Sequence, residues 1–156
     1  MINIEIPGRG VLEVEHLVLD LNGTLAMDGT VSKPVVERLR DLRSRLQVHL
    51  VTADTFGTAS ALEPLELDIL VLEPGDQVEA KARFIRKLGA SRTAAIGNGM
   101  NDEGMLREAA LGIAVIGREG AATRALLAAD LAVPSIEDGL DLLRIPRRLV
   151  ASLRTA

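Results

Sequence analysis

The stretch "LVLDLNGTLAMDG" (Leu17–Gly29) begins as an apolar run and ends in an acidic residue, two turn formers and a hydroxyl. Buried parallel strands are near-continuous runs of Val, Ile and Leu, so the first residues predict a strand inside an α/β sheet. In open α/β sheets, ligands bind at the carboxyl ends of the strands. Asp20 follows the run directly and is therefore a candidate for chemistry.

The rest of the chain alternates strand and helix patterns. Residues 2–20 predict a hairpin around "PGRG" whose second arm continues toward the strand ending at Asp20. Asp28-Gly29 predicts a two-residue turn, and Ser32 with Pro34 predicts a helix start. Further strands are expected at 48–52, 67–72, 93–97, 111–116 and 131–133, and further helices at 56–62, 78–89, 102–110, 120–129 and from Ser135 onward, divided or kinked at Pro146.

This alternation predicts a three-layer α/β/α, Rossmann-like fold with a parallel central sheet and an N-terminal β-hairpin. With 156 residues and no linker, we expect a single domain over residues 1–156.

The composition argues against several classes of function. A net charge of −4 without a basic stripe argues against nucleic-acid binding. The absence of cysteine excludes disulfides and thiolate metal sites and favours a cytoplasmic location. No apolar run approaches the length of a bilayer span, which argues against a membrane partner.

Four polar side chains follow, or lie beside, the ends of predicted strands. A carboxylate such as Asp20 can attack phosphorus and store the group as an acyl phosphate. Thr52 and backbone N–H groups of glycine-rich turns can bind phosphoryl oxygens. Lys81 offers a compact positive charge, and Asp102 can help to hold magnesium. Together these residues predict phosphoryl transfer.

Four segments resemble, in order and spacing, the motifs of the haloacid dehalogenase (HAD) superfamily of phosphatases and P-type ATPases. They are "DLNGTLA" (20–26), "LVTADT" (50–55), "EAKARFIRKLG" with Lys81 (79–89) and "IGNGMND" (96–102).

The resemblance covers about residues 15–145 and is closest to the phosphorylation domain of P-type ATPases. It implies the HAD fold, an aspartyl-phosphate mechanism and Mg²⁺ as the cofactor. By the same resemblance, the catalytic residues are Asp20, Asn22, Thr52 and Lys81, the phosphate-binding residues are Gly23, Thr52, Ala53, Lys81 and Asn101, and the metal ligands are Asp20, Asn22, Asn98 and Asp102.

Two positions depart from the family pattern. The phosphatases have a general acid/base Asp where this chain has Asn22, and an amide cannot carry that proton. Losing such catalysis slows a reaction by about 10²–10⁴, so turnover is expected to be slow unless another group substitutes. Asn98 replaces a carboxylate that binds magnesium in the family, which predicts weak metal affinity.

The gaps between the motifs are too short for a cap domain, so we expect a capless site. Residues 24–52 leave room for a flap and one helix, and residues 52–81 for a helix and a strand. The nucleotide-binding domain and membrane helices of a pump are absent from this sequence. An open site suits a phosphorylated small molecule or a phosphoprotein as substrate, and it allows a homo-oligomer in which a second copy covers it.

Two functions therefore stay open. The first is a slow, Mg²⁺-dependent phosphohydrolase, favoured by the four retained residues. The second is a weak or inactive phosphorylation-domain-like module that binds a phosphorylated ligand or a protein, suggested by Asn22 and Asn98. A dinucleotide site is disfavoured because the glycines lack the required spacing after the first strand.

Several residues have simpler interpretations when taken alone. Lys81 could lie on a solvated helix face, and Asp102 could merely cap a helix. His16 and His49 are interpreted as structural. Arg144, with Arg147 and Arg148, is expected on a solvated face.

Overall fold

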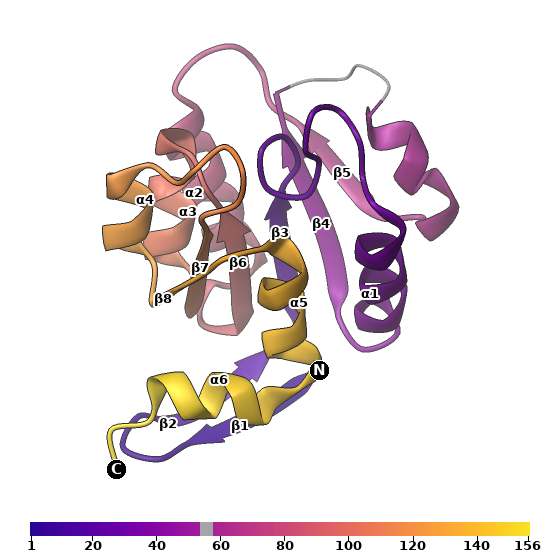
Figure 1. Cartoon of the computed structure of the whole chain (residues 1–156). Coiled ribbons are helices and arrows are strands. Elements are labelled where there is room, and N and C mark those ends of the chain that lie inside the picture. Colours follow the sequence, from indigo (N-terminus) through magenta and orange to yellow (C-terminus); the bar gives the residue numbers. More distant parts are fainter. Residues whose placement is uncertain (54–57) are drawn as a thin grey trace.

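Six parallel strands form the central sheet of the computed structural model, which describes residues 1–53 and 58–156 (Figure 1). Their order is β5-β4-β3-β6-β7-β8, and every neighbouring pair is parallel, which confirms the predicted sheet. The strands are β3 (His16–Asp20), β4 (Gln47–Thr52), β5 (Asp68–Val71), β6 (Thr93–Gly97), β7 (Leu111–Val115) and β8 (Leu131–Val133).

Helices cover both faces of this sheet, as predicted (Figure 1). Alternation along β3 shows how the two layers arise, because successive side chains of a strand point to opposite faces. Leu17 and Leu19 belong to one apolar core, while Val18 belongs to the other. The first core takes side chains from α1 (Lys33–Arg43) and α5 (Ile136–Arg144), and the second from α2 (Gln77–Leu88), α3 (Glu103–Glu108) and α4 (Thr123–Ala128).

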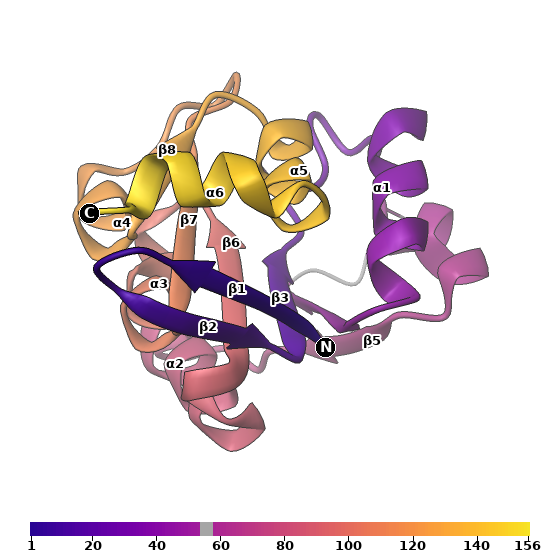
Figure 2. The ribbon, with the colours of Figure 1, turned by 90° about the horizontal axis from the view of Figure 1, so that it is seen from below.

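The N-terminal hairpin forms a sheet of its own from β1 (Ile2–Ile6) and β2 (Gly10–Val14). As predicted, the second arm continues toward β3, with only Glu15 between the two strands, although β2 itself pairs with β1 alone and not with the central sheet. Helix α6 (Pro146–Leu153) lies across this hairpin (Figure 2). The predicted division of the C-terminal helix at its proline is confirmed.

Local signals set most of the element boundaries. Ser32 precedes α1, and Gly89 ends α2 with a φ of 107° that favours glycine. The turn at Asp28-Gly29 is present, with φ values of 52° and 76° and two hydrogen bonds of 3.0 Å between the residues on either side. The helix predicted at 56–62 is a 3₁₀ helix, η1 (Thr58–Leu65), and the first two predicted residues, 56 and 57, lie outside the described residues. Two further 3₁₀ turns are η2 (Ala90–Arg92) and η3 (Met100–Asp102).

The chain fills the sheet outward from its middle. It runs through β3, β4 and β5 on one side, and then crosses over to β6, β7 and β8. The order therefore reverses between β3 and β6, which is where ligands bind in open α/β sheets. In residues 1–53 and 58–156, no helix combines the length and the apolar character that a bilayer span requires.

Candidate active site

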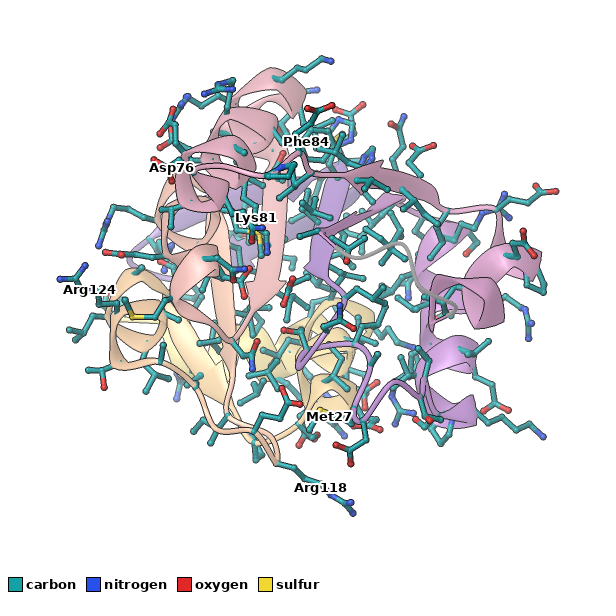
Figure 3. The ribbon with its side chains drawn as sticks, turned by 90° about the horizontal axis from the view of Figure 1, so that it is seen from above. Met27, Asp76, Lys81, Phe84, Arg118 and Arg124 are labelled. Carbon is teal, nitrogen blue, oxygen red and sulfur yellow. The ribbon has the colours of Figure 1, made fainter. Side chains whose placement is uncertain are left out.

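A buried lysine joins two aspartates at this reversal point. Lys81 Nζ lies 2.9 Å from Asp20 Oδ1 and 2.8 Å from Asp102 Oδ1, and the lysine side chain is 1% exposed. Figure 3 shows Lys81 directed inward from its helix, whereas Arg118 and Arg124 point away from the molecule. The solvated-face interpretation of Lys81 is therefore wrong.

Helix α2 aims the lysine inward because its apolar face is buried. Ala82 and Ile85 are buried in the same helix as Lys81, and Ile85 belongs to the second apolar core. Asp76 begins the helix, and its side chain accepts a hydrogen bond from the Glu79 amide at 3.2 Å. The helix start and the buried stripe together fix which side of the helix faces Asp20.

One ammonium cannot neutralise two carboxylates, and the pKa values reflect this. Burial raises the pKa of Asp20 to about 7, and the negative charge of Asp102 adds to the rise, while Lys81 opposes it. Burial disfavours the charged lysine, but the two aspartates together hold the pKa of Lys81 above its ordinary value. The cluster carries a net negative charge in its ionised form, which suits a divalent cation.

Asp102 is fully buried and organises the loop after β6. Its Oδ2 accepts hydrogen bonds from the backbone amides of Asn98 at 2.9 Å and Gly99 at 3.0 Å. Gly97 allows this close approach, since a Cβ there would lie 2.6 Å from Asp102 Cγ. The bond to the Gly99 amide also caps η3, but the bond to Lys81 shows that Asp102 is not merely a helix cap.

Thr24 is a site residue that the sequence analysis did not single out. Its buried hydroxyl lies 3.4 Å from Asp20 Oδ2 and 3.1 Å from Asn98 Oδ1. The Asn98 amide in turn donates to the carbonyl of Gly120 at 3.3 Å. Asn98 therefore links the Asp20 loop to the loop after β7.

Thr52 lies at the same sheet edge as Asp20. It ends β4, the neighbouring strand, and is 2% exposed. Ala53 follows it on the surface. Their role in binding phosphate stays a prediction of the resemblance.

The remaining predicted residues lie around the rim. Asn22 is exposed, whereas Gly23 is buried and has a φ of 79°. Asn101 donates from Nδ2 to Gln77 Oε1 at 3.0 Å, so its amide ties η3 to α2. The structure gives Asn101 no direct contact with Asp20 among its described hydrogen bonds.

The oxygens at this edge are suitable for a hard cation. Both carboxylate oxygens of Asp102 already accept hydrogen bonds from the chain, which leaves Asp20 Oδ2 and Asn98 Oδ1 facing Thr24. Carboxylate and amide oxygens are ligands that Mg²⁺ accepts. No group of three or more acidic, His or Cys side chains within the described part of the chain is arranged to hold a metal.

The two histidines form a separate chain across the sheet. His16 Nδ1 lies 3.1 Å from His49 Nε2, and His49 Nδ1 lies 3.3 Å from Asp68 Oδ2. His49 also meets the ring of Phe84 edge-on, and its burial lowers its pKa. The acidic partner comes from a neighbouring strand, which sequence proximity could not reveal.

No family model matches the chain. The uncharacterized protein MJ0073 of Methanocaldococcus jannaschii is 43% identical over 84 residues, which cover 51% of this chain and 90% of that protein. Copper-transporting ATPase 1 of Rhizobium meliloti is 33% identical over 148 residues, which cover 86% of this chain but only 16% of that protein.

Solved structures share the fold at low identity. One is a 3-deoxy-D-manno-octulosonate 8-phosphate phosphatase from Moraxella catarrhalis, in complex with magnesium, phosphate and the sugar, with a TM-score of 0.69, 17% identity and coverage of 90% of this chain and 94% of the other. Another is a putative HAD family hydrolase from Streptomyces avermitilis, with a TM-score of 0.64, 20% identity and coverage of 91% and 85%.

Proposed function

Because the chain has the haloacid dehalogenase fold and belongs to one family with the uncharacterized protein MJ0073, we propose that it is a phosphohydrolase that forms an aspartyl phosphate at Asp20. The observation that carries this proposal is the buried Lys81 held between Asp20 and Asp102 where the strand order reverses. A purely structural ion pair needs no second carboxylate. The surplus negative charge is what a site for a cation and a phosphoryl group requires.

In this function, Asp20 Oδ2 attacks phosphorus while its Oδ1 stays bonded to Lys81. Lys81 also faces the incoming phosphoryl oxygens, and the hydroxyl of Thr52 and the backbone amide of Ala53 bind them. The amide of Gly23 is not included, because it donates to the carbonyl of Ala26 at 2.9 Å. Asp102 positions Lys81 and the Asn98 loop. These are roles of preorganised charge, which dominate phosphoryl transfer.

Mg²⁺ is the proposed cofactor, held by Asp20, the Asn22 carbonyl and Asn98, with Asp102 acting through the loop that it organises. When bound, the ion neutralises charge on the phosphoryl oxygens. The magnesium in the Moraxella catarrhalis phosphatase structure supports this choice.

Small phosphorylated molecules are the favoured substrates. A cavity of about 340 Å³ lies between the loop carrying Met27 and the start of α5, and its lining is mainly apolar. Thr24 lines this cavity, whereas Asp20, Thr52 and Lys81 do not, so it adjoins the reacting groups rather than containing them. This volume falls in the range of small-molecule sites. The phosphorylated sugar named for the structural neighbour belongs to the same class.

Trapping of the phosphoenzyme tests the proposal. Wild-type protein incubated with acetyl phosphate and Mg²⁺ is expected to gain one phosphoryl group by intact-mass spectrometry, and to hydrolyse p-nitrophenyl phosphate. Asp20→Asn is expected to do neither, while the matched control Asp28→Asn, in the exposed turn nearby, is expected to do both. Labelling or turnover that persists in Asp20→Asn would refute the proposal.

A phosphoryl-binding module without turnover is the second candidate. The observation in its favour is that both ends of the Asn98 amide are engaged within the protein, by Thr24 and Gly120. The double variant Asn22→Asp with Asn98→Asp separates the two functions. If it gains strong phosphatase activity where the wild type has none, the native site binds rather than hydrolyses.

A further inference from the structure

We propose that Glu119 is the proton-transfer group of this site and takes the place of the acid that is absent at position 22. The inference rests on the proposed function, because it assigns a residue to the same reaction. Glu119 lies in the loop between β7 and α4, outside the four motif segments.

The position of the carboxylate carries the argument. A Cβ built on Gly23 would lie 2.3 Å from Glu119 Oε2 and 3.0 Å from Asn98 Nδ2. Glu119 Oε2 therefore sits directly against the backbone of the residue that follows Asn22. Gly23 leaves the space for it, and its φ of 79° also favours glycine.

The loop that carries Glu119 is fastened on both sides. The amide of Gly117 donates to Pro134 O at 3.0 Å, and the amide of Ala122 donates to Asn98 O at 2.8 Å. Between these two bonds, the Gly120 carbonyl accepts from Asn98 Nδ2. The backbone on either side of Glu119 is therefore held in place, in part by Asn98, which also faces Thr24.

The loop also lies against the turn that follows β3. Figure 3 shows Arg118 and Met27 on the same side of the sheet edge, and a Cβ on Gly117 would lie 3.7 Å from Met27 Cε. Glu119 itself is exposed, so it can exchange protons with water between steps. An acid/base group for repeated turnover needs such access.

The amide at position 98 fits this arrangement. Asn98 Nδ2 points toward the Gly120 carbonyl and the space that Glu119 occupies. A carboxylate at this position would have no N–H to donate there and would place a second negative charge beside Glu119. The departures at positions 22 and 98 are thus compatible with an acid that comes from residue 119.

The proton movements balance over the two steps. In the first, the bond from Asp20 Oδ2 to phosphorus forms, the bond to the leaving oxygen breaks, and protonated Glu119 gives its proton to that oxygen. In the second, the Glu119 carboxylate takes a proton from water as the water oxygen bonds to phosphorus and the bond to Asp20 breaks. Phosphate leaves, and both carboxyl groups return to their starting states.

The variant Glu119→Gln tests this role by single-turnover kinetics. We expect phosphoenzyme hydrolysis to slow by about 10²–10⁴. We also expect the first step to slow more with an alkyl phosphate, whose leaving oxygen needs a proton, than with p-nitrophenyl phosphate. A residue that only holds the loop would not produce this leaving-group dependence. Glu73→Gln, an exposed loop carboxylate after β5, is the matched control with unchanged rates.

Rescue gives an independent readout. In the Glu119→Gln background, Asn22→Asp is expected to restore hydrolysis, because the acid returns to position 22. If Glu119→Gln hydrolyses its phosphoenzyme at the wild-type rate while Asp20→Asn forms none, the role of Glu119 is refuted and the phosphohydrolase stands. If the wild type forms no phosphoenzyme and turns over neither substrate, the proposed function fails and this inference fails with it.

Discussion

Two buried carboxylates of this molecule, Asp20 and Asp141, have opposite ionic surroundings. Each is 7% exposed. Asp20 shares the single ammonium of Lys81 with a second aspartate. Asp141 accepts hydrogen bonds from two guanidinium groups, from Arg38 at 3.0 and 3.2 Å and from Arg144 at 2.6 Å, and a third, that of Arg148, lies 3.7 Å away.

The numbers of neighbouring cations and carboxylates explain the directions in which the two pKa values shift. Burial raises the pKa of Asp20 to about 7, and a neighbouring aspartate adds to it. Burial also acts on Asp141, but the hydrogen bonds from Arg38 and Arg144 outweigh it, and its pKa lies below the ordinary value. A surplus of cations gives a stabilising tie between α1 and α5, whereas a surplus of carboxylates leaves a destabilised group that is available for chemistry.

Lys81→Met should have the largest effect on stability. It leaves two carboxylates buried without their cation, and breaking a buried pair in this way costs about 3–5 kcal/mol. Urea denaturation should show the loss, and phosphoenzyme formation should disappear. Lys87→Met, an exposed lysine on the same helix, should change the unfolding free energy very little. A small loss in Lys81→Met would mean that the two carboxylates do not depend on this lysine.

Asp141→Asn should have the second largest effect. Hydrogen bonds to charged groups contribute about 1.5–3 kcal/mol, and this substitution removes the charge from two arginine partners. Because the folded pKa of Asp141 lies below 3.8, its stabilisation is present above that pH and is lost as the pH falls through the folded value. Wild type should therefore lose its advantage over Asp141→Asn in acid. Glu37→Gln, exposed on α1, serves as the control, and equal acid profiles for wild type and Asp141→Asn would contradict the prediction.

Asp20→Asn should change stability in the opposite direction. Removing a destabilised charge from a functional site commonly gains about 0.5–2 kcal/mol. The folded pKa of about 7 lies above 3.8, so the folded state binds the extra proton between these values, and stability falls as the pH rises through that window. Asp20→Asn lacks this fall, so its advantage over wild type should grow from pH 4 to 7 in thermal melts. A variant that is less stable than wild type at pH 7 would show that Asp20 is a structural ion-pair member like Asp141.

The same contrast explains what the sequence could predict. Asp20 and Lys81 were found because one ends an apolar run and the other stands within a recognisable motif on a regular helix. The interpretation of Arg144 as solvated was wrong. It pairs with Asp141 three positions earlier on the same helix, and its second partner, Asp41, lies 103 positions earlier in the chain on another helix. Such pairs depend on how helices pack, and no local pattern records that packing.

Loop geometry limited the prediction of the site in a similar way. Thr24 stands in the "NGT" segment, but its position between Asp20 and Asn98 depends on the path of the turn after β3. Glu119 meets Gly23 across the sheet edge through two loops that are far apart in sequence. The glycine at position 23 is a sequence signal that another group approaches its backbone closely. It does not reveal which group that is.

Arg45→Gln should have the smallest effect on the unfolding free energy, because it removes an ion pair at the surface. Arg45 pairs with Asp41 at 3.0 Å, but the two side chains are 37% and 42% exposed. Exposed pairs contribute about 0.2–1 kcal/mol and are screened by salt. We expect a loss in that range at low ionic strength, which shrinks at high ionic strength, while the loss from Arg38→Gln persists because Arg38 binds the buried Asp141. Equal salt dependence of the two variants would contradict this prediction. It would mean that the Arg38–Asp141 pair behaves like an ordinary surface ion pair, and that neither its burial nor the number of cations around Asp141 strengthens it.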